Sequence, residues 1–212
     1  AEMGGVLPEI PAMKWNEVDG FSGPYNRANE AQKALYDPII DSINLEFKER
    51  WPSMSREEKM RWKYQRYMQD YLGTIASVDD NVGRLLDYLE ETGLDQNTMI
   101  IYTSDQGFYL GEHGWFDKRF IYDESFKTPL LIQWPGHIAP GSTNDEMVQN
   151  LDFAQTLLEV ADIKAPGDMQ GESLLPLLKG EATWTREAVY YHYYEYPAVH
   201  MVKRHFGIVS KA

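Results

Sequence analysis

The sequence has no cysteine among its 212 residues. Disulfide bonds, thiolate metal sites and a cysteine nucleophile are therefore excluded within this chain. No apolar run approaches the roughly 20 residues that a membrane-spanning helix needs, and the first residues lack the basic and apolar segments of a signal peptide. Positive charge is scarce, because 20 Lys and Arg stand against 33 Asp and Glu, a formal net charge of −13. Such a chain is poorly suited to binding nucleic acid through its phosphates, so no nucleic-acid partner is expected.

The first quarter of the chain is expected to be irregular and then helical. Residues 1–28 are rich in glycine, proline and polar side chains, which is typical of irregular structure. Apolar residues then recur at near-helical spacing from Asn29 to about Arg50. Pro38 is expected to interrupt this segment, since proline cannot donate the helical hydrogen bond.

A long helix is the clearest pattern in the sequence. Ser55 and Glu58 are spaced as a capping box, which marks its start, and Gly93 suits the position just after its end. Gly73 and Gly83 inside it each cost up to ~1 kcal/mol relative to alanine. Apolar residues recur three or four positions apart and are expected to pack in the core: Leu72, Ile75, Val82, Leu85, Leu86 and Leu89.

The second half of the chain predicts short strands and helices. Two apolar, β-prone runs read as strands at 99–102 and 129–134, and a third strand is expected at 188–194. The chain stops inside what reads as another strand, from residue 205 on. Further elements are expected from spacing and composition: a short helix at 120–125, an edge strand at 147–149, and helices at 152–161 and 173–178, the last with Pro176 in its first turn.

Asp105 and Gln106 are candidate metal ligands. They follow the first predicted strand, and open α/β sheets place ligands at the carboxyl ends of strands. Their oxygens suit Ca²⁺ or Mg²⁺ better than zinc. Two ligands do not complete a site for a cation that takes about 6–8 oxygens, and an Asp-Gln-Gly at the end of a strand is more often a simple turn than a metal site.

Three further side chains are candidates for binding or catalysis. The ammonium of Lys118 can hold a sulfuryl or phosphoryl oxygen, or it can be solvated and paired with a nearby aspartate. His113 can donate a proton near neutral pH, or it can be ordinary polar surface. His205 belongs to a small basic cluster with His200, Lys203 and Arg204, which suits an anionic sugar as well as it suits a chance surface cluster.

The combination of these residues is more specific than its parts. The chain reads YTSDQG at 102–107, GEHG at 111–114, Asp117-Lys118 after two intervening residues, and WPG at 134–136. This order and spacing resembles the sulfatases of the alkaline-phosphatase superfamily, in particular enzymes similar to N-acetylglucosamine-6-sulfatase and other glycosaminoglycan sulfatases. The resemblance runs from about Tyr67 to the end of the chain and corresponds to the C-terminal portion of that family.

The resemblance implies a fold, an activity and roles for the candidate residues. The fold would be α/β, part of an alkaline-phosphatase-like sandwich with a mixed sheet flanked by helices. Asp105 and Gln106 would be Ca²⁺ ligands, Lys118 would contact the sulfate, and His113 and His205 would lie at the substrate. The activity would be hydrolysis of sulfated carbohydrates in the periplasm or outside the cell.

The sequence also departs from the family. The nucleophile of these enzymes is a formylglycine made within a C/S-x-P-x-R motif, and no such motif occurs in the chain. We therefore expect a chain cut at both ends that alone does not turn over substrate. Its expected division is an irregular and helical segment at 1–54, half of the α/β domain at 55–200, and the start of a further subdomain at 201–212. An exposed edge of the strand at 99–102 is expected to favour dimers.

Two other functions remain open from the sequence. A phosphodiesterase or phosphonate hydrolase of the same superfamily would share the sheet and the lysine loop, but such enzymes usually carry more histidine and aspartate metal ligands. A non-catalytic binding or assembly module would account for the missing nucleophile.

Overall fold

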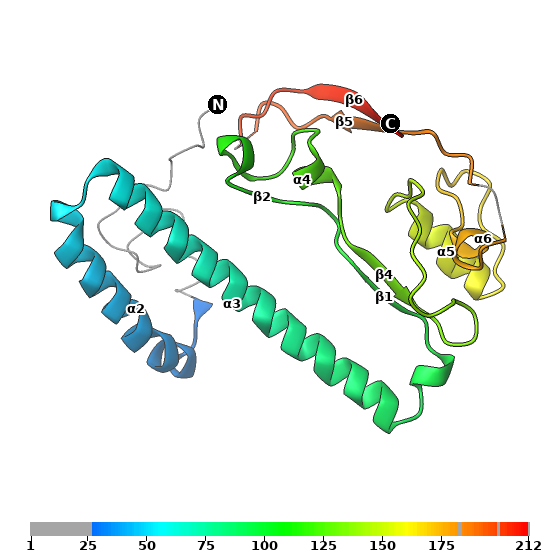
Figure 1. Ribbon diagram of the computed structural model, residues 1–212, viewed down its shortest axis with the longest axis horizontal. Coiled ribbons are helices and arrows are strands. Elements are labelled where there is room, and N and C mark those ends of the chain that lie inside the picture. The colour runs from blue at the N-terminus through cyan, green and yellow to red at the C-terminus, as the bar shows by residue number, and fades with distance from the viewer. Residues whose placement is uncertain (1–26, 182–183, 199, 212) are drawn as a thin grey trace. The chain divides into compact units, whose positions relative to one another are not determined.

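The protein is described from a computed structural model, in which residues 27–181, 184–198 and 200–211 are described (Figure 1). Most of the segment that was expected to be irregular, residues 1–28, lies outside these ranges. The chain divides into two compact units at the boundary between Asn81 and Val82.

The first unit contains helix α2, Glu30–Arg50. Its N-cap is Asn29, whose side-chain oxygen accepts a hydrogen bond from the Gln32 backbone amide. The Asn29 backbone amide donates in turn to the Gln32 side-chain oxygen, and both bonds are 2.9 Å long. Pro38 lies inside the helix, so the expected break is wrong. Proline has a φ close to that of a helix and removes only one backbone hydrogen bond, a loss that the rest of this 21-residue helix tolerates.

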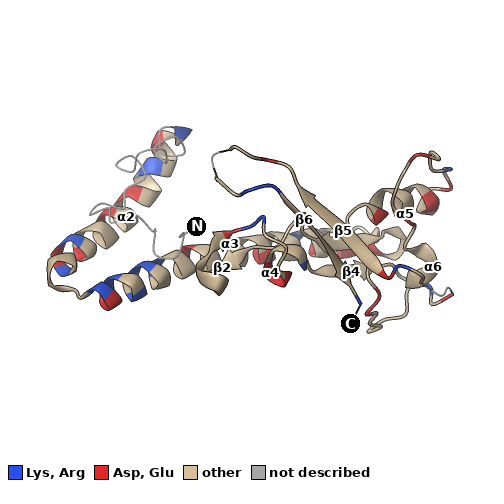
Figure 2. Cartoon of the chain, turned by 90° about the horizontal axis from the view of Figure 1, so that it is seen from above, with Lys and Arg blue, Asp and Glu red and all other residues tan. Residues whose placement is uncertain are grey.

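Helix α3, Arg56–Glu91, begins and ends where its capping residues predict. The Ser55 amide donates to the Glu58 carboxylate at 2.8 Å, and the Glu58 amide donates to the Ser55 hydroxyl at 3.2 Å. Gly93 follows the helix with a φ of 68°, the left-handed conformation that glycine adopts without strain. Figure 2 colours residues of both charges along α2 and the first half of α3. Glu57 and Arg61 of α3 form an ion pair at 2.7 Å.

The apolar stripe of α3 is exposed, so the expectation that it packs in the core is wrong. Within α3, all of which the structure describes, no residue is buried. Leu72 is 55% exposed and Leu85 is 57% exposed. An amphipathic pattern shows which face of a helix favours a partner, but it does not show that the same stretch of chain supplies one.

The second unit contains three pairs of antiparallel strands (Figure 1). The registers place Ile101 opposite Ile132, Tyr109 opposite Asp117, and Tyr191 opposite Gly207. In chain order the strands are β1 (Ile100–Thr103) with β4 (Leu130–Gln133), β2 (Tyr109–Leu110) with β3 (Phe116–Asp117), and β5 (Ala188–Tyr193) with β6 (His205–Ser210).

These pairs confirm the strands expected around 100, 130, 190 and 205. Among the described residues β1 has one neighbouring strand, so association through its other edge stays a prediction.

The helices of the second unit are short. Their bounds are α4, Asp123–Phe126, α5, Asp152–Val160, and α6, Leu175–Leu178, with single 3-10 turns at Asp95–Asn97 and Glu112–Gly114. Helices α5 and α6 confirm the helices predicted at 152–161 and 173–178, including Pro176 in the first turn of α6. Helix α4 starts three residues later than expected. The expected strand at 147–149 is absent from this part of the structure, since the Gln149 amide donates to the Asp152 side chain instead of to a strand.

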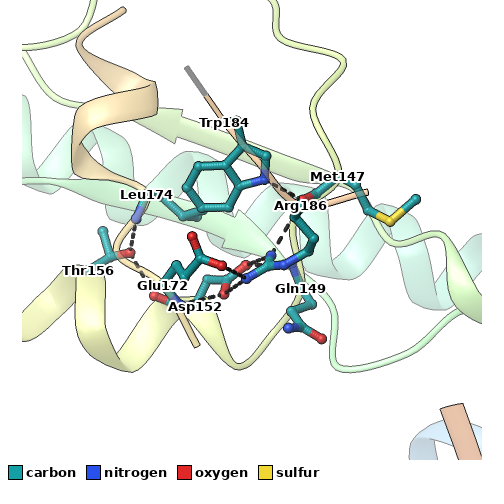
Figure 3. A network of polar contacts seen from close by, with 8 residues as sticks. All are labelled: Met147, Gln149, Asp152, Thr156, Glu172, Leu174, Trp184 and Arg186. Carbon is teal, nitrogen blue, oxygen red and sulfur yellow. Dashed lines mark hydrogen bonds and ion pairs between the residues drawn. The ribbon is translucent and has the colours of Figure 1, made fainter. Parts of the chain in front are cut away.

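A buried ion pair holds α5 to the chain that follows it (Figure 3). Asp152 is fully buried, and its two carboxylate oxygens accept from the two terminal nitrogens of Arg186 at 2.5 and 2.7 Å. The backbone amides of Gln149 and Glu172 also donate to this carboxylate, at 2.8 and 2.9 Å. The Asp152 hydrogen bond is the main cause that raises the pKa of Arg186. The pair therefore joins three segments that lie far apart in the sequence.

Candidate functional site

The site begins with a tight hairpin between β2 and β3. Gly111, His113 and Gly114 all have positive φ, at 120°, 56° and 74°. Only a chain with glycines at two of these positions makes such a turn without large strain. The turn closes with a hydrogen bond from the Gly111 amide to the Trp115 carbonyl at 2.9 Å. The GEHG motif is therefore a structural turn that carries His113 at its tip.

His113 is positioned by an aromatic partner and a carboxylate. Its ring stacks on Tyr122, with centroids 4.3 Å apart and planes 24° apart. Its Nε2 lies 3.3 Å from the Glu124 carboxylate. The side chain remains 39% exposed, so it can reach a bound molecule. A histidine held by a carboxylate in this way is suited to donating a hydrogen bond or a proton.

Tyr109 packs against the loop that carries His113 and Lys118. It is fully buried, and its hydroxyl donates to the Phe120 carbonyl at 3.1 Å. The ring meets Trp115 edge to face at 5.7 Å. Burial raises the pKa of Tyr109 to about 12, and the negative charge of Glu124 adds to the rise. The hydroxyl therefore stays protonated and keeps its hydrogen bond at physiological pH.

Lys118 lies in the middle of a strained turn, Asp117–Arg119, which we call the Lys118 turn. Asp117 has a φ of 79° and Arg119 a φ of 106°, values that side chains with a Cβ rarely adopt. The two flanking side chains form an ion pair with each other. The Asp117 carboxylate also lies 3.5 Å from Nδ1 of His200. Lys118 is thus held by the pairing of its two neighbours.

Ser125 of α4 ties the Lys118 turn to the predicted metal ligands. Its hydroxyl accepts from the Arg119 amide at 3.1 Å, and its carbonyl accepts from the Gly107 amide at 2.9 Å. The segment with Asp105 and the segment with Lys118 are therefore fastened to one residue. That the two side chains converge on one anion stays a prediction.

Asp105 and Gln106 were predicted to be ligands of a hard cation, and this role stays a prediction. Asp105 is exposed two residues after the end of β1, Ser104 Oγ lies 3.5 Å from its carboxylate, and Asn150 donates to its backbone carbonyl at 3.0 Å. Among the described residues, no group of three or more His, Cys, Asp or Glu side chains is placed to hold a metal ion. The two oxygens fit calcium in chemistry but not in number, since calcium takes about 6–8 oxygens.

His205 points towards the backbone of the Lys118 turn. Its Nε2 lies 3.0 Å from the Arg119 carbonyl oxygen, and its Nδ1 lies 2.8 Å from the Lys203 carbonyl oxygen. The ring stacks on Phe120 at 5.5 Å. Both ring nitrogens therefore lie within hydrogen-bond distance of backbone carbonyl oxygens, and the substrate contact suggested by the sequence stays a prediction.

Comparison with known proteins finds homologues among the sulfatases. Residues 111–212 match the family model described as N-sulphoglucosamine sulphohydrolase, C-terminal. The N-acetylglucosamine-6-O-sulfatase of Bacteroides thetaiotaomicron is 58% identical over 151 residues, which cover 69% of this chain and 27% of that protein. The chain is homologous to the sulfatases. The residues that match the family model begin with Gly111 of the GEHG turn and include the Lys118 turn and the β5–β6 hairpin.

Solved structures agree with this homology. This sulfatase homologue superposes with a TM-score of 0.80 and 49% identity on a protein solved in complex with its substrate D-glucosamine-2-N,6-O-disulfate, over 88% of this chain and 38% of the other. A phosphonate monoester hydrolase from Silicibacter pomeroyi matches less well, with a TM-score of 0.59 and 31% identity over 67% of this chain and 28% of the other. The comparisons confirm the predicted fold class, an alkaline-phosphatase-like α/β fold, and they place the phosphonate hydrolases as more distant relatives. The chain spans less than two fifths of the length of each of these proteins.

Sequence reasoning assigned no role to Arg119 of the Lys118 turn, nor to Ser125 and Tyr191, which contact it. Contacts between Arg119 and residues 72 or 86 positions away leave no local spacing to detect. The available signal was the high number of aromatic residues in 188–194, because alternate residues of this strand face the loop.

Proposed function

We propose that the chain is part of an enzyme that hydrolyses sulfate esters of glucosamine-type sugars. The observation that carries the proposal is the 58% identity to an N-acetylglucosamine-6-O-sulfatase across the segment with the Lys118 turn. The formylglycine nucleophile would lie outside this chain. Residues 55–200 would form the second half of the α/β domain, and 201–212 the start of a further subdomain.

Lys118 and His113 would carry the chemistry that this chain supplies. The Lys118 ammonium would hold a non-bridging sulfate oxygen and stabilise the charge on it in the transition state. His113 would donate a hydrogen bond to the substrate, with its ring oriented by Glu124 at 3.3 Å. Asp105 and Gln106 would hold a calcium ion together with ligands from elsewhere, and the ion would add positive charge at the sulfate.

Replacement of Lys118 tests the proposal. In the whole enzyme, Lys118→Ala should lower kcat/KM for 4-nitrophenyl sulfate by about 100- to 1,000-fold, the usual effect of removing one group that stabilises transition-state charge. The exposed Lys179 gives a control of the same chemistry, and Lys179→Ala should leave the rate unchanged. Equal rates for the two variants would contradict the role of Lys118.

Two further measurements separate the alternatives. Faster hydrolysis of an aryl phosphonate than of an aryl sulfate would favour a phosphonate hydrolase. Coding sequence upstream of Ala1 without a C/S-x-P-x-R motif would favour the non-catalytic module.

The metal can be tested separately from the lysine. Chelation with EGTA should abolish aryl sulfatase activity, and added Ca²⁺ should restore it. Asp105→Asn should raise the Ca²⁺ concentration needed for half-restoration, while Asp168→Asn, another exposed aspartate, should not. Full activity after chelation would contradict a calcium site.

We also propose that the enzyme acts outside the cytoplasm. Of the helices in the described part of the chain, none combines the length and the apolar composition that crossing a bilayer requires. A Drosophila melanogaster relative, 40% identical over 112 residues, is named an extracellular sulfatase. Fractionation of cells that express the whole protein should find it in the periplasm or the medium.

A further inference from the structure

The carbonyl oxygen of Arg119 is the point where the β5–β6 hairpin meets the Lys118 turn. The Tyr191 hydroxyl donates to this oxygen at 2.8 Å, and Nε2 of His205 lies 3.0 Å from it. Burial raises the pKa of Tyr191, so its hydroxyl remains a donor. One carbonyl next to Lys118 thus has two side-chain partners, one from each strand of the hairpin.

Other contacts press the hairpin against the same segment. A Cβ added at Gly207 would lie 2.6 Å from Cδ1 of Ile121, so β6 packs closely against Ile121 and a larger residue there would displace the end of that side chain. The Tyr191 ring meets Phe126 edge to face at 4.5 Å. The hairpin therefore packs against the segment that follows Arg119, and one residue of each strand makes a polar contact with the Arg119 carbonyl.

We propose that Tyr191 and His205 are positioning residues that set where Lys118 stands. The inference rests on the proposed role of Lys118. Arg119 has a φ of 106°, so its backbone conformation persists only because surrounding contacts hold it. Its amide is held by Ser125, its side chain by Asp117, and its carbonyl by the hairpin. The first two partners lie on the loop itself, so the hairpin supplies the contacts that come from another part of the fold.

The position of the Lys118 backbone matters because the lysine side chain is long and flexible. An ammonium on a four-carbon stem loses reach and direction when its Cα moves. A displacement of about 1 Å at a reacting centre can cost about 100-fold in rate. The hairpin thus contributes to sulfate hydrolysis without touching the substrate.

Tyr191→Phe in the whole enzyme tests this role. The change removes the hydroxyl and leaves the ring against Phe126. We expect kcat/KM for 4-nitrophenyl sulfate to fall about tenfold, the equivalent of one lost hydrogen bond. Tyr190→Phe is the matched control, because Tyr190 is the adjacent residue, is 60% exposed, and has its hydroxyl 3.1 Å from His192. It should leave kcat/KM unchanged.

A second background distinguishes positioning from general support of the fold. With Lys118→Ala already present, Tyr191→Phe should cause no further loss, because the group that it positions is gone. His205→Ala should show the same dependence on Lys118. The inhibition constant of inorganic sulfate should rise in Tyr191→Phe by a similar factor to the fall in kcat/KM.

Three results would overturn the inference, and they have different meanings. If Tyr191→Phe behaves like Tyr190→Phe, the hydroxyl does not position Lys118, although Lys118 keeps its role. If Tyr191→Phe costs the same factor with and without Lys118, it acts elsewhere in the protein. If Lys118→Ala itself has no effect, the proposed function of Lys118 fails, and the positioning role fails with it.

Discussion

Removing the carboxylate of Asp152 should destabilise the protein severely. Each of its two oxygens accepts one hydrogen bond from Arg186 and one from a backbone amide, at distances between 2.5 and 2.9 Å. Asp152→Ala would leave the Arg186 guanidinium buried without its main partner. Breaking a buried pair in this way costs about 3–5 kcal/mol, which is a large share of the about 5–15 kcal/mol that stabilises a typical domain.

Substitution by asparagine separates charge from shape. Asp152→Asn keeps the volume, but its amide nitrogen would face donors, since every partner of the carboxylate is an N–H group. We expect a loss of about 2–3 kcal/mol, because at least one buried donor remains unpaired. The double replacement Asp152→Leu with Arg186→Met should recover only part of the loss, since an apolar pair removes the unpaired guanidinium but leaves the Gln149 and Glu172 amides without an acceptor.

Urea unfolding followed by far-ultraviolet circular dichroism measures these changes. The control is Asp123→Ala, which breaks the exposed pair of Asp123 with Lys127 and should not change the unfolding midpoint measurably. The reasoning is refuted if Asp152→Ala shifts the midpoint no more than Asp123→Ala does. It is also refuted if Arg186→Met costs as much in the Asp152→Ala background as it does alone.

Three further predictions concern the loop and the long helix. Gly107→Ala should lower the free energy of unfolding by about 1–3 kcal/mol, because the new Cβ would lie 2.1 Å from the Glu124 carbonyl oxygen. Gly167→Ala is the control in the same urea titration, because a Cβ at Gly167 would have no atom within 4 Å. Gly83→Ala should raise the free energy of unfolding by up to about 1 kcal/mol, since Gly83 lies inside α3 with free space around its Cα; a loss of stability would show that a neighbour packs there. The protein should lose stability as the pH rises from 10 to 12, because the pKa of Tyr109 is raised from 10.0 to about 12 by folding and its neutral form is favoured in the native state; Tyr109→Phe should show a smaller loss over this range, and an equal loss would contradict the assignment.

The helix ends and tight turns could be predicted from the sequence because they depend on residues only a few positions apart. The capping box of α3 joins residues three positions apart. The turn at 111–114 depends on two glycines whose positive φ no other residue adopts as easily. Pro38 was the exception, because a proline is a strong local signal that a long helix can still accommodate.

The candidate site was only partly predictable. The sequence placed Asp105, His113 and Lys118 on one loop, and the structure keeps them there. The sequence did not indicate that Ser125 joins the segment of Asp105 to the Lys118 turn, with its carbonyl bonded to Gly107 and its hydroxyl bonded to Arg119. Nor did the helical pattern of α3 show that Leu72 and Leu85 are exposed. Periodicity defines a face, and only the arrangement of other segments determines what that face contacts.

The amino-acid sequence by itself determined which residues can do chemistry and which short elements carry them, because capping, turn formation and side-chain chemistry act over a few neighbouring positions. The tertiary structure decided where His205 lies, against the Arg119 carbonyl, where we propose that it helps to position Lys118. Its contact with Arg119 joins residues 86 positions apart. Such a contact depends on how β6 packs against the loop, and this packing arises only when the chain folds.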